Sequence, residues 1–155
     1  MVVISDTSPL TALLLTGRGE LLRSLFDRVV IPPAVQSELM RAHSTLPVWI
    51  EIMAPNAIPP SVSDGGLDAG ETEAIALALE LRPDTLLIDE RLGRRLALRH
   101  GLPVTGLLGL LVLAKQRGLI TELVPVIREL QDEGSCWFGH DLLVDVCSAV
   151  GEAWA

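Results

Sequence analysis

The chain opens with Val2-Val3-Ile4-Ser5-Asp6-Thr7-Ser8-Pro9, and this stretch decides how the rest of the sequence is interpreted. The first residues are β-branched and too few for a helix, so they predict a short buried strand. Ser8 and Pro9 are typical of a helix start, with Ser8 as the N-cap and Pro9 at the first helical position. Asp6 therefore falls between a strand and a helix. In open α/β sheets, ligands bind beyond the carboxyl ends of the strands.

Composition limits the classes of protein that this chain can belong to. Its 155 residues are 49% apolar, which predicts one domain spanning residues 1–155 with a substantial core. A formal charge of −8 argues against a broad basic face for nucleic acid, and with three Trp, two Phe and no Tyr, base-stacking platforms of the kind that single-strand binders use are not expected. Cys136 and Cys147 are expected to be free thiols in a reducing compartment.

No targeting or membrane segment is expected. The first residues lack a basic region, and Asp6 interrupts their apolar run. The longest uncharged apolar stretch, residues 101–114, is too short to cross a bilayer. We therefore expect a cytoplasmic protein that does not span the membrane.

Short apolar runs alternate with helical patterns along the chain. Strands are expected at residues 2–4, 29–31, 48–53, 85–88 and 102–105, the last at a sheet edge because it contains Pro103. Helices are expected at 9–15, 20–26, 33–42, 69–81, 90–100, 107–117, 121–133 and 141–150, with a long loop at 55–69. This order favours an α/β fold with a parallel sheet covered on both faces, to which the helices at about 121–150 are appended.

Four acidic residues occupy positions where an apolar or turn residue would be ordinary. Asp6 and Asp89 each follow a predicted strand, Glu38 lies in the apolar stripe of its helix, and Glu71 lies four residues before Ile75 on the inward face of another. Buried carboxylates are costly unless something compensates them, and clustered ones either share protons or bind a cation. An all-oxygen set of ligands suits Mg²⁺ or Mn²⁺.

Each acid also has a purely structural alternative. Asp6 could cap the following turn, Asp68 and Glu71 fit a capping box, and Asp89 could simply favour the dipole of the helix that it precedes. It is the joint occurrence of the four that indicates a site.

A run of arginines follows Asp89 on one predicted helix, at positions 91, 94, 95 and 99. Such a run is either a solvated charged face or a local contact patch for phosphate beside the acids. On the second interpretation Arg94 and Arg95 are the candidates to position a phosphate, together with Ser8 near the first acid.

The order and content of these motifs resemble a PIN domain, of the small prokaryotic group with a late helix rich in Gly and Leu. The segments that carry the resemblance are Asp6-Thr7-Ser8-Pro9-Leu10, Ile31-Pro32-Pro33-Ala34-Val35 running to Glu38-Leu39, Gly70-Glu71 running to Ala78, and Leu86-Leu87-Ile88-Asp89. They fall within a stretch from about residue 2 to residue 134. The resemblance implies a three-layer α/β/α fold and a ribonuclease dependent on Mg²⁺ or Mn²⁺, with Asp6, Glu38, Glu71 and Asp89 at the acidic positions. Many members carry a hydroxyl residue where this chain has Leu87, and Asp where it has Glu71.

The resemblance further implies the toxin of a toxin–antitoxin pair, so a protein antitoxin is an expected partner besides the RNA substrate. A homodimer is expected from the chain itself, because the helix at 107–114 has no polar face. Two alternatives remain open: an inactive binding module of the same fold, and a phosphate-handling regulatory or phosphatase domain. The second is disfavoured by Ser8 and by Thr105-Gly106, which stand where such domains need a second Asp and a Lys.

Overall fold

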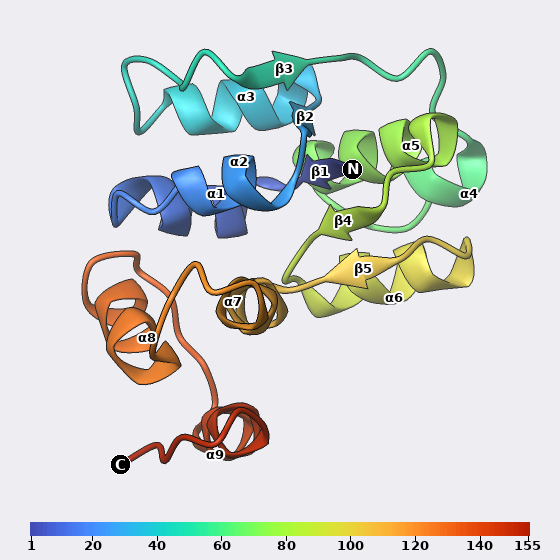
Figure 1. Cartoon of the computed structure of the whole chain (residues 1–155). Coiled ribbons are helices and arrows are strands. Elements are labelled where there is room, and N and C mark those ends of the chain that lie inside the picture. The colour runs from blue at the N-terminus through green and yellow to red at the C-terminus, as the bar shows by residue number, and fades with distance from the viewer.

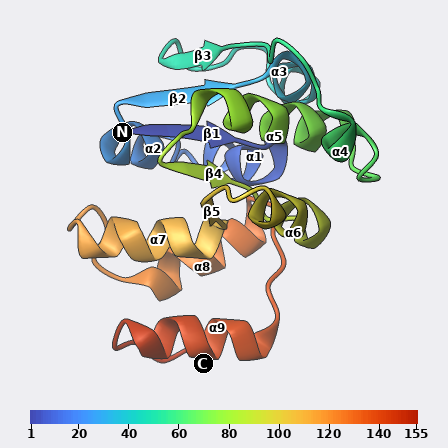
Figure 2. The same cartoon turned by 90° about the vertical axis from the view of Figure 1, so that its right-hand side faces the viewer.

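A five-stranded parallel sheet forms the centre of the protein in a computed structural model that describes residues 1–155. The strands are β1 (Val2–Ser5), β2 (Arg28–Ile31), β3 (Ile50–Ile52), β4 (Thr85–Leu87) and β5 (Val104–Thr105). They lie in the order β3-β2-β1-β4-β5, as Figure 2 shows, and every pairing is parallel. Because β1 is the middle strand, the chain leaves the sheet at Asp6 in the centre of its carboxyl edge.

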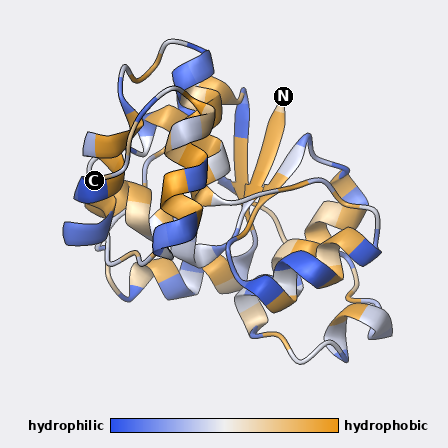
Figure 3. Ribbon diagram, turned by 90° about the horizontal axis from the view of Figure 1, so that it is seen from below, coloured by the Kyte–Doolittle hydropathy of each residue, from blue (hydrophilic) through white to orange (hydrophobic).

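Nine helices surround this sheet. They are α1 (Thr7–Leu15), α2 (Glu20–Leu25), α3 (Pro33–Met40), α4 (Pro60–Ser63), α5 (Ala69–Leu81), α6 (Arg91–Arg99), α7 (Leu107–Gln116), α8 (Leu123–Asp132) and α9 (His140–Ala149) (Figure 1). Successive strand residues point to opposite faces. Val3 belongs to an apolar cluster that extends through α1, α2, α3 and α7 to α9, whereas Ile4 belongs to another that includes residues of α4, α5 and α6. The predicted α/β class with a central parallel sheet covered on both faces is confirmed, and Figure 3 shows the apolar character of the N-terminal strand.

Three local predictions are wrong in detail. The first helix begins at Thr7 with Asp6 in the N-cap position, so Ser8 is not the N-cap. The first turn tolerates Pro9 because its N–H groups have no partner within the helix. The expected loop at 55–69 contains the short helix α4, which the fully buried Val62 anchors. Helix α3 ends at Met40, which leaves Ala42 exposed beyond it.

Helix α7 is covered within the chain. Its inward residues Leu110 and Leu111 are fully buried in the cluster that also contains residues of α8 and α9. The end of the chain is fastened beside it by Glu152, which pairs with Lys115 of α7 at 2.5 Å. The apolar side chains of α7 are therefore largely buried within one chain and do not need a second copy of the protein to cover them. No helix combines the length and apolar character needed to cross a membrane.

Candidate active site

Asp6 is a buried acid at the centre of the sheet's carboxyl edge. It is 3% exposed, and its backbone N–H donates to the carbonyl of Leu87, which ties it to strand β4 at 2.9 Å. Although Asp6 stands at the N-cap position of α1, its carboxylate makes no capping hydrogen bond. Burial raises the pKa of Asp6 to about 7, which the nearby amide of Thr7 only partly opposes. The capping explanation for this acid therefore does not hold.

Glu71 is the second buried acid, and one of its oxygens has no partner. Its backbone N–H donates to the N-cap side chain of Asp68 at 2.8 Å, as in a capping box. The reciprocal half of that box is absent, because Oε2 of Glu71 is buried without a hydrogen bond. Burial, followed by the charges of Asp6 and Asp68, raises the pKa of Glu71 to about 8. The carboxyl lies against Gly93 of α6, where a larger residue would displace it.

Glu38 lies between two fully buried residues of α3, Val35 and Leu39, and is itself half-buried. The hydroxyl of Thr7 donates a hydrogen bond to Oε2 of Glu38. The carboxylate also lies over the start of α5, because a Cβ on Gly70 would be 2.9 Å from Oε1. Helix α3 therefore brings this acid from the neighbouring strand towards the first turns of α1 and α5.

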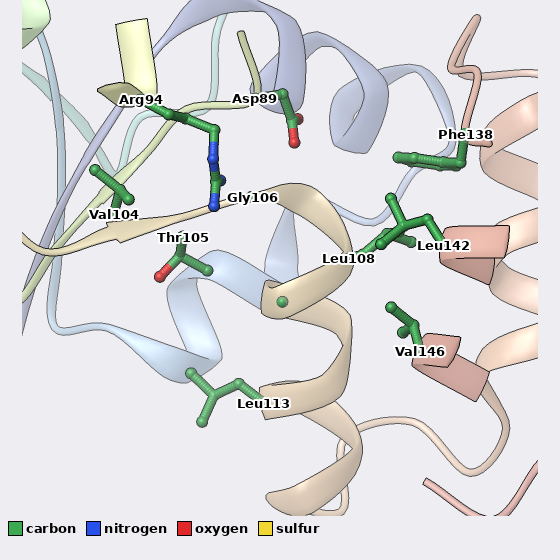
Figure 4. A pocket seen from close by; sticks show the side chains of 11 residues that line it. Asp89, Arg94, Val104, Thr105, Gly106, Leu108, Leu113, Phe138, Leu142 and Val146 are labelled. Carbon is green, nitrogen blue, oxygen red and sulfur yellow. The ribbon is translucent and has the colours of Figure 1, made fainter. Parts of the chain in front are cut away.

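Asp89 follows β4 but turns towards α7. Its Oδ1 accepts a hydrogen bond from the backbone N–H of Leu107 at 3.0 Å. The guanidinium of Arg94 lies beside it, since a Cβ on Gly106 would be 2.8 Å from both groups. Desolvation raises the pKa of Asp89, while the Leu107 amide and Arg94 lower it. Figure 4 shows the Asp89 side chain directed towards the start of α7.

Asp6 and Glu71 instead share their surroundings with Glu90, the residue after Asp89. The charges of Asp68 and Glu90 raise the pKa of both buried acids, and the charge of Glu38 also raises the pKa of Asp6. Glu90 was not selected from the sequence, where it reads as an ordinary helix-start acid. The only sequence feature that could have pointed to Glu90 is that it directly follows Asp89. Neighbouring residues at a helix start point in different directions, so either of the two could have faced the buried acids.

Of the three residues predicted to contact substrate, Ser8 and Arg95 are exposed beside cavities, whereas Arg94 is partly engaged within the protein. Ser8 is exposed and lines a cavity between the starts of α1 and α6. Arg94 donates to the carbonyl of Ile88 at 2.9 Å, so its guanidinium is partly committed to holding the start of α6. Arg95 and Arg91 are exposed and line an adjoining cavity. Arg91, which the sequence placed in the arginine run but did not single out, also borders the cavity of Ser8.

These carboxylates suit a divalent cation by their chemistry. Asp6 and Glu71 are almost fully buried, their pKa values are raised, and Oε2 of Glu71 has no hydrogen-bond donor. A cation bound between them would offset the buried negative charge and give Oε2 a partner. No three His, Cys, Asp or Glu side chains converge closely enough to hold an ion as they stand. Glu38 is engaged by the hydroxyl of Thr7, and Asp89 turns aside towards α7, where it accepts the hydrogen bond from Leu107.

Comparisons with known proteins agree with this architecture. The family model DUF3368, described as a PIN domain, matches residues 2–152. Among solved structures, the chain is similar to a PilT N-terminus domain protein from the hyperthermophilic archaeon Sulfolobus solfataricus P2. The TM-score is 0.57 at 24% sequence identity, over 72% of this chain and 92% of the archaeal one, which supports the fold. Among curated proteins, none is similar enough to count as a match.

Proposed function

The chain belongs to the PIN domain family, and from this premise we propose that it is a ribonuclease dependent on Mg²⁺ or Mn²⁺ that hydrolyses phosphodiester bonds of RNA. Members of the family are typically metal-dependent nucleases. The observation that supports the proposal in this chain is the unpartnered Oε2 of Glu71 beside the buried carboxyl of Asp6. A fold under no functional demand would replace such a pair with apolar residues.

In the proposed site, Asp6 and Glu71 form the inner pair of cation ligands. Glu38 completes the set from α3, held by the Thr7 hydroxyl. Asp89, the fourth acid expected from the sequence, would have to leave the Leu107 amide to join them, and Glu90 is placed to serve instead. A divalent cation bound there lowers the pKa of a water molecule and offsets the negative charge of the phosphate.

The basic side chains of α6 have a separate part in the proposal. Arg91 and Arg95 are exposed beside the acids and offer guanidinium groups to RNA phosphates. With a net charge of −8, the protein needs this local patch to hold a polyanion near the acids. Arg94 orders the start of α6 through the Ile88 carbonyl, and Ser8 lines the cavity where RNA would enter.

A cleavage assay tests the proposal. A single-stranded RNA is incubated with the protein in Mg²⁺, in Mn²⁺ and in EDTA. We expect cleavage only with a metal, and a loss of roughly 100-fold or more in Asp6→Asn and Glu71→Gln, the scale on which removal of a charge-stabilising group slows catalysis. Glu20→Gln, an exposed acid on α2, is the matched control and should retain activity. A parent chain that cuts no RNA under any of these conditions supports the inactive binding module.

We also propose that the nuclease is the toxin of a toxin–antitoxin pair. An acidic protein with a buried carboxylate pair is complementary to an inhibitor that presents Arg or Lys. The test is co-expression with the small protein encoded beside it. Co-purification and loss of cleavage are expected, and failure of that protein to bind or inhibit would contradict the assignment.

That the protein forms a homodimer is a separate prediction, which does not depend on the nuclease activity. The apolar helix α7 no longer supports it, because Leu110 and Leu111 are buried within the chain. Other apolar residues are still exposed on α6 and α9, namely Leu92, Leu98 and Leu142. Light scattering at micromolar concentration decides between dimer and monomer.

A further inference from the structure

The loop between α8 and α9 presents a tryptophan to solvent at the edge of the candidate active site. Trp137 is 85% exposed, although Trp is highly buried on average in folded proteins. The chain has only three Trp and two Phe, and Trp137 and Phe138 both belong to this loop. An exposed indole at such a position buries little area within the fold and leaves its ring open to a ligand.

A single cavity joins this loop to Asp89 and Glu90 at the start of α6, whereas Asp6, Glu38 and Glu71 do not line it. It has a volume of about 680 Å³ and is bordered by the first turn of α1, the start of α6 and the loop. The residues that matter are Ser8 on α1, Glu90 and Arg91 at the start of α6, and Trp137 and Phe138 on the loop. One hollow therefore offers carboxylates, a guanidinium group and an aromatic ring.

The backbone holds the loop at this position independently of the indole. A Cβ on Gly134 would lie 2.7 Å from the carbonyl oxygen of Leu130 and 3.3 Å from that of Ala12, so only glycine fits between α8 and α1. The N–H of Cys136 donates to Leu130 at 3.3 Å. Replacement of Trp137 should therefore leave the loop in place.

A second cavity continues behind the loop. It has a volume of about 610 Å³ and lies between α7 and α9, with Asp89 and Arg94 at one end (Figure 4). The two cavities share Asp89, Phe138 and Leu142. The loop thus separates a polar hollow beside Glu90 from a more apolar one, and Trp137 borders only the polar hollow.

We propose that Trp137 is a stacking platform for one base of single-stranded RNA that enters this cavity beside Glu90, with Arg91 contacting the adjoining backbone. The identity of the ligand as RNA rests on the proposed function. Aromatic side chains stack on any base, since every base has a π-face, and a groove with positive charge follows the backbone. The occupant is thus an unpaired nucleotide, because a base inside a duplex has no free face to offer.

The test measures binding separately from cleavage. The probe is a dye-labelled single-stranded RNA of mixed sequence, and affinity is measured by fluorescence anisotropy in Mg²⁺ with the Asp6→Asn background, so that the probe stays intact. Trp137→Ala should weaken binding by about 5- to 150-fold, the loss expected for one base–aromatic stack. Trp137→Phe, which keeps an aromatic ring, should recover most of the affinity. Val48→Ala, at an equally exposed apolar residue before β3, should change nothing.

A set of probes, each with one abasic position, identifies the stacked base. For the protein that keeps Trp137, one of these abasic probes should bind more weakly than the intact probe. For Trp137→Ala, the same abasic probe and the intact probe should bind equally well. Equal binding by Trp137 and Trp137→Ala, or no binding by either, overturns the inference. Unchanged RNA binding together with loss of a protein inhibitor in Trp137→Ala would also overturn it, and would make the loop a protein-docking site. Absence of cleavage by the parent chain concerns the proposed nuclease activity alone, because the stacking comparison does not depend on it.

Discussion

The carboxylate of Glu71 lies directly against Gly93, at the point where α5 and α6 meet. The same relation occurs twice more at the site, between Glu38 and Gly70 and near Asp89 at Gly106. In each case the missing side chain of a glycine leaves room for an acid. Three glycines therefore shape the site as much as the acids do.

Replacement of Gly93 by Ala tests this relation. The new Cβ would meet both Oε2 of Glu71 and Cδ1 of Ile88, the latter at 2.7 Å, so the carboxyl must move or the helices must separate. We expect loss of metal-dependent cleavage and a destabilisation of about 1–3 kcal/mol, typical of overpacking. Thermal melts and the cleavage assay measure the two effects.

The matched control is Gly109→Ala in α7, where the nearest atom, a methyl of Thr105, would be 3.3 Å away. Ala is the better helix former by about 0.8–1 kcal/mol, so this variant should be neutral or slightly stabilised. If Gly93→Ala behaved in the same way, Gly93 would not be needed for the position of Glu71.

The second prediction concerns pH. Asp6 and Glu71 have pKa values raised to about 7 and about 8 from ordinary values of 3.8 and 4.5. The folded state therefore binds more protons than the unfolded state between about pH 4 and pH 8, and the free energy of unfolding falls as pH rises through that window. The metal-free protein should be less stable at pH 8 than at pH 5, as denaturant unfolding in EDTA would measure.

Glu71→Gln should flatten this dependence because it removes one of the two charges. At pH 8 without metal, the variant should melt higher than the parent by about 2–4 °C, the shift that 1 kcal/mol produces in a domain of this size. In the parent, Mg²⁺ at roughly ten times its dissociation constant should restore about 1.4 kcal/mol. A parent chain whose stability is the same at pH 5 and pH 8 would contradict the burial of these charges.

The third prediction concerns Glu152, which fastens the end of the chain. Its carboxylate accepts hydrogen bonds from the backbone N–H groups of Leu123 and Val124, at 2.8 and 3.0 Å, and pairs with Lys115. Glu152→Gln should cost about 0.5–2 kcal/mol, the range for loss of a helix cap. Urea unfolding measures the difference, and Glu122→Gln, an acid at the same helix start without a capping bond, is the control.

The contribution of Glu152 should also disappear in acid. Burial raises its pKa, but the two amides and Lys115 outweigh that effect, so the net pKa lies below the ordinary 4.5. A carboxyl whose folded pKa is lowered stabilises above its unfolded pKa, and the effect is lost as pH falls through the folded value. Parent and variant should therefore converge in stability as pH falls below 4.5 and through the lowered folded pKa of Glu152. A difference that persisted there would mean that packing, not charge, is responsible.

The sequence predicted the architecture well because its strands are buried on both faces. Val3 and Ile4 pack into different clusters, which is why the strands read as continuous apolar runs and not as alternating ones. The edge position of β5 followed from Pro103. The start of α1 was misplaced, because Pro9 is compatible with any position in a first helical turn.

The candidate site was less predictable than the fold. Asp6 could be selected because it directly follows a buried strand, and Glu71 because a carboxylate on the inward face of a helix stands out in a periodic pattern. The direction of Asp89 could not, because it depends on the amide of Leu107, eighteen residues further along the chain. The position of Trp137 could not be predicted either, because it depends on the close approach of Gly134 to α1, which places the loop beside the start of α6.

The last prediction decides which acid after β4 belongs to the site. Asp89 accepts a hydrogen bond from Leu107 and lies beside Arg94, whereas the charge of Glu90, like that of Asp68, raises the pKa of both Asp6 and Glu71. Glu90→Gln should therefore reduce the stabilisation by Mn²⁺ and slow cleavage strongly. Asp89→Asn keeps an oxygen for the Leu107 amide and should lose less of both. Melting temperatures with EDTA and with Mn²⁺, together with cleavage rates, give both quantities for each variant. If Asp89→Asn abolished the Mn²⁺ response while Glu90→Gln preserved it, Asp89 would be the ligand, and its side chain would have to turn away from α7 when the cation binds.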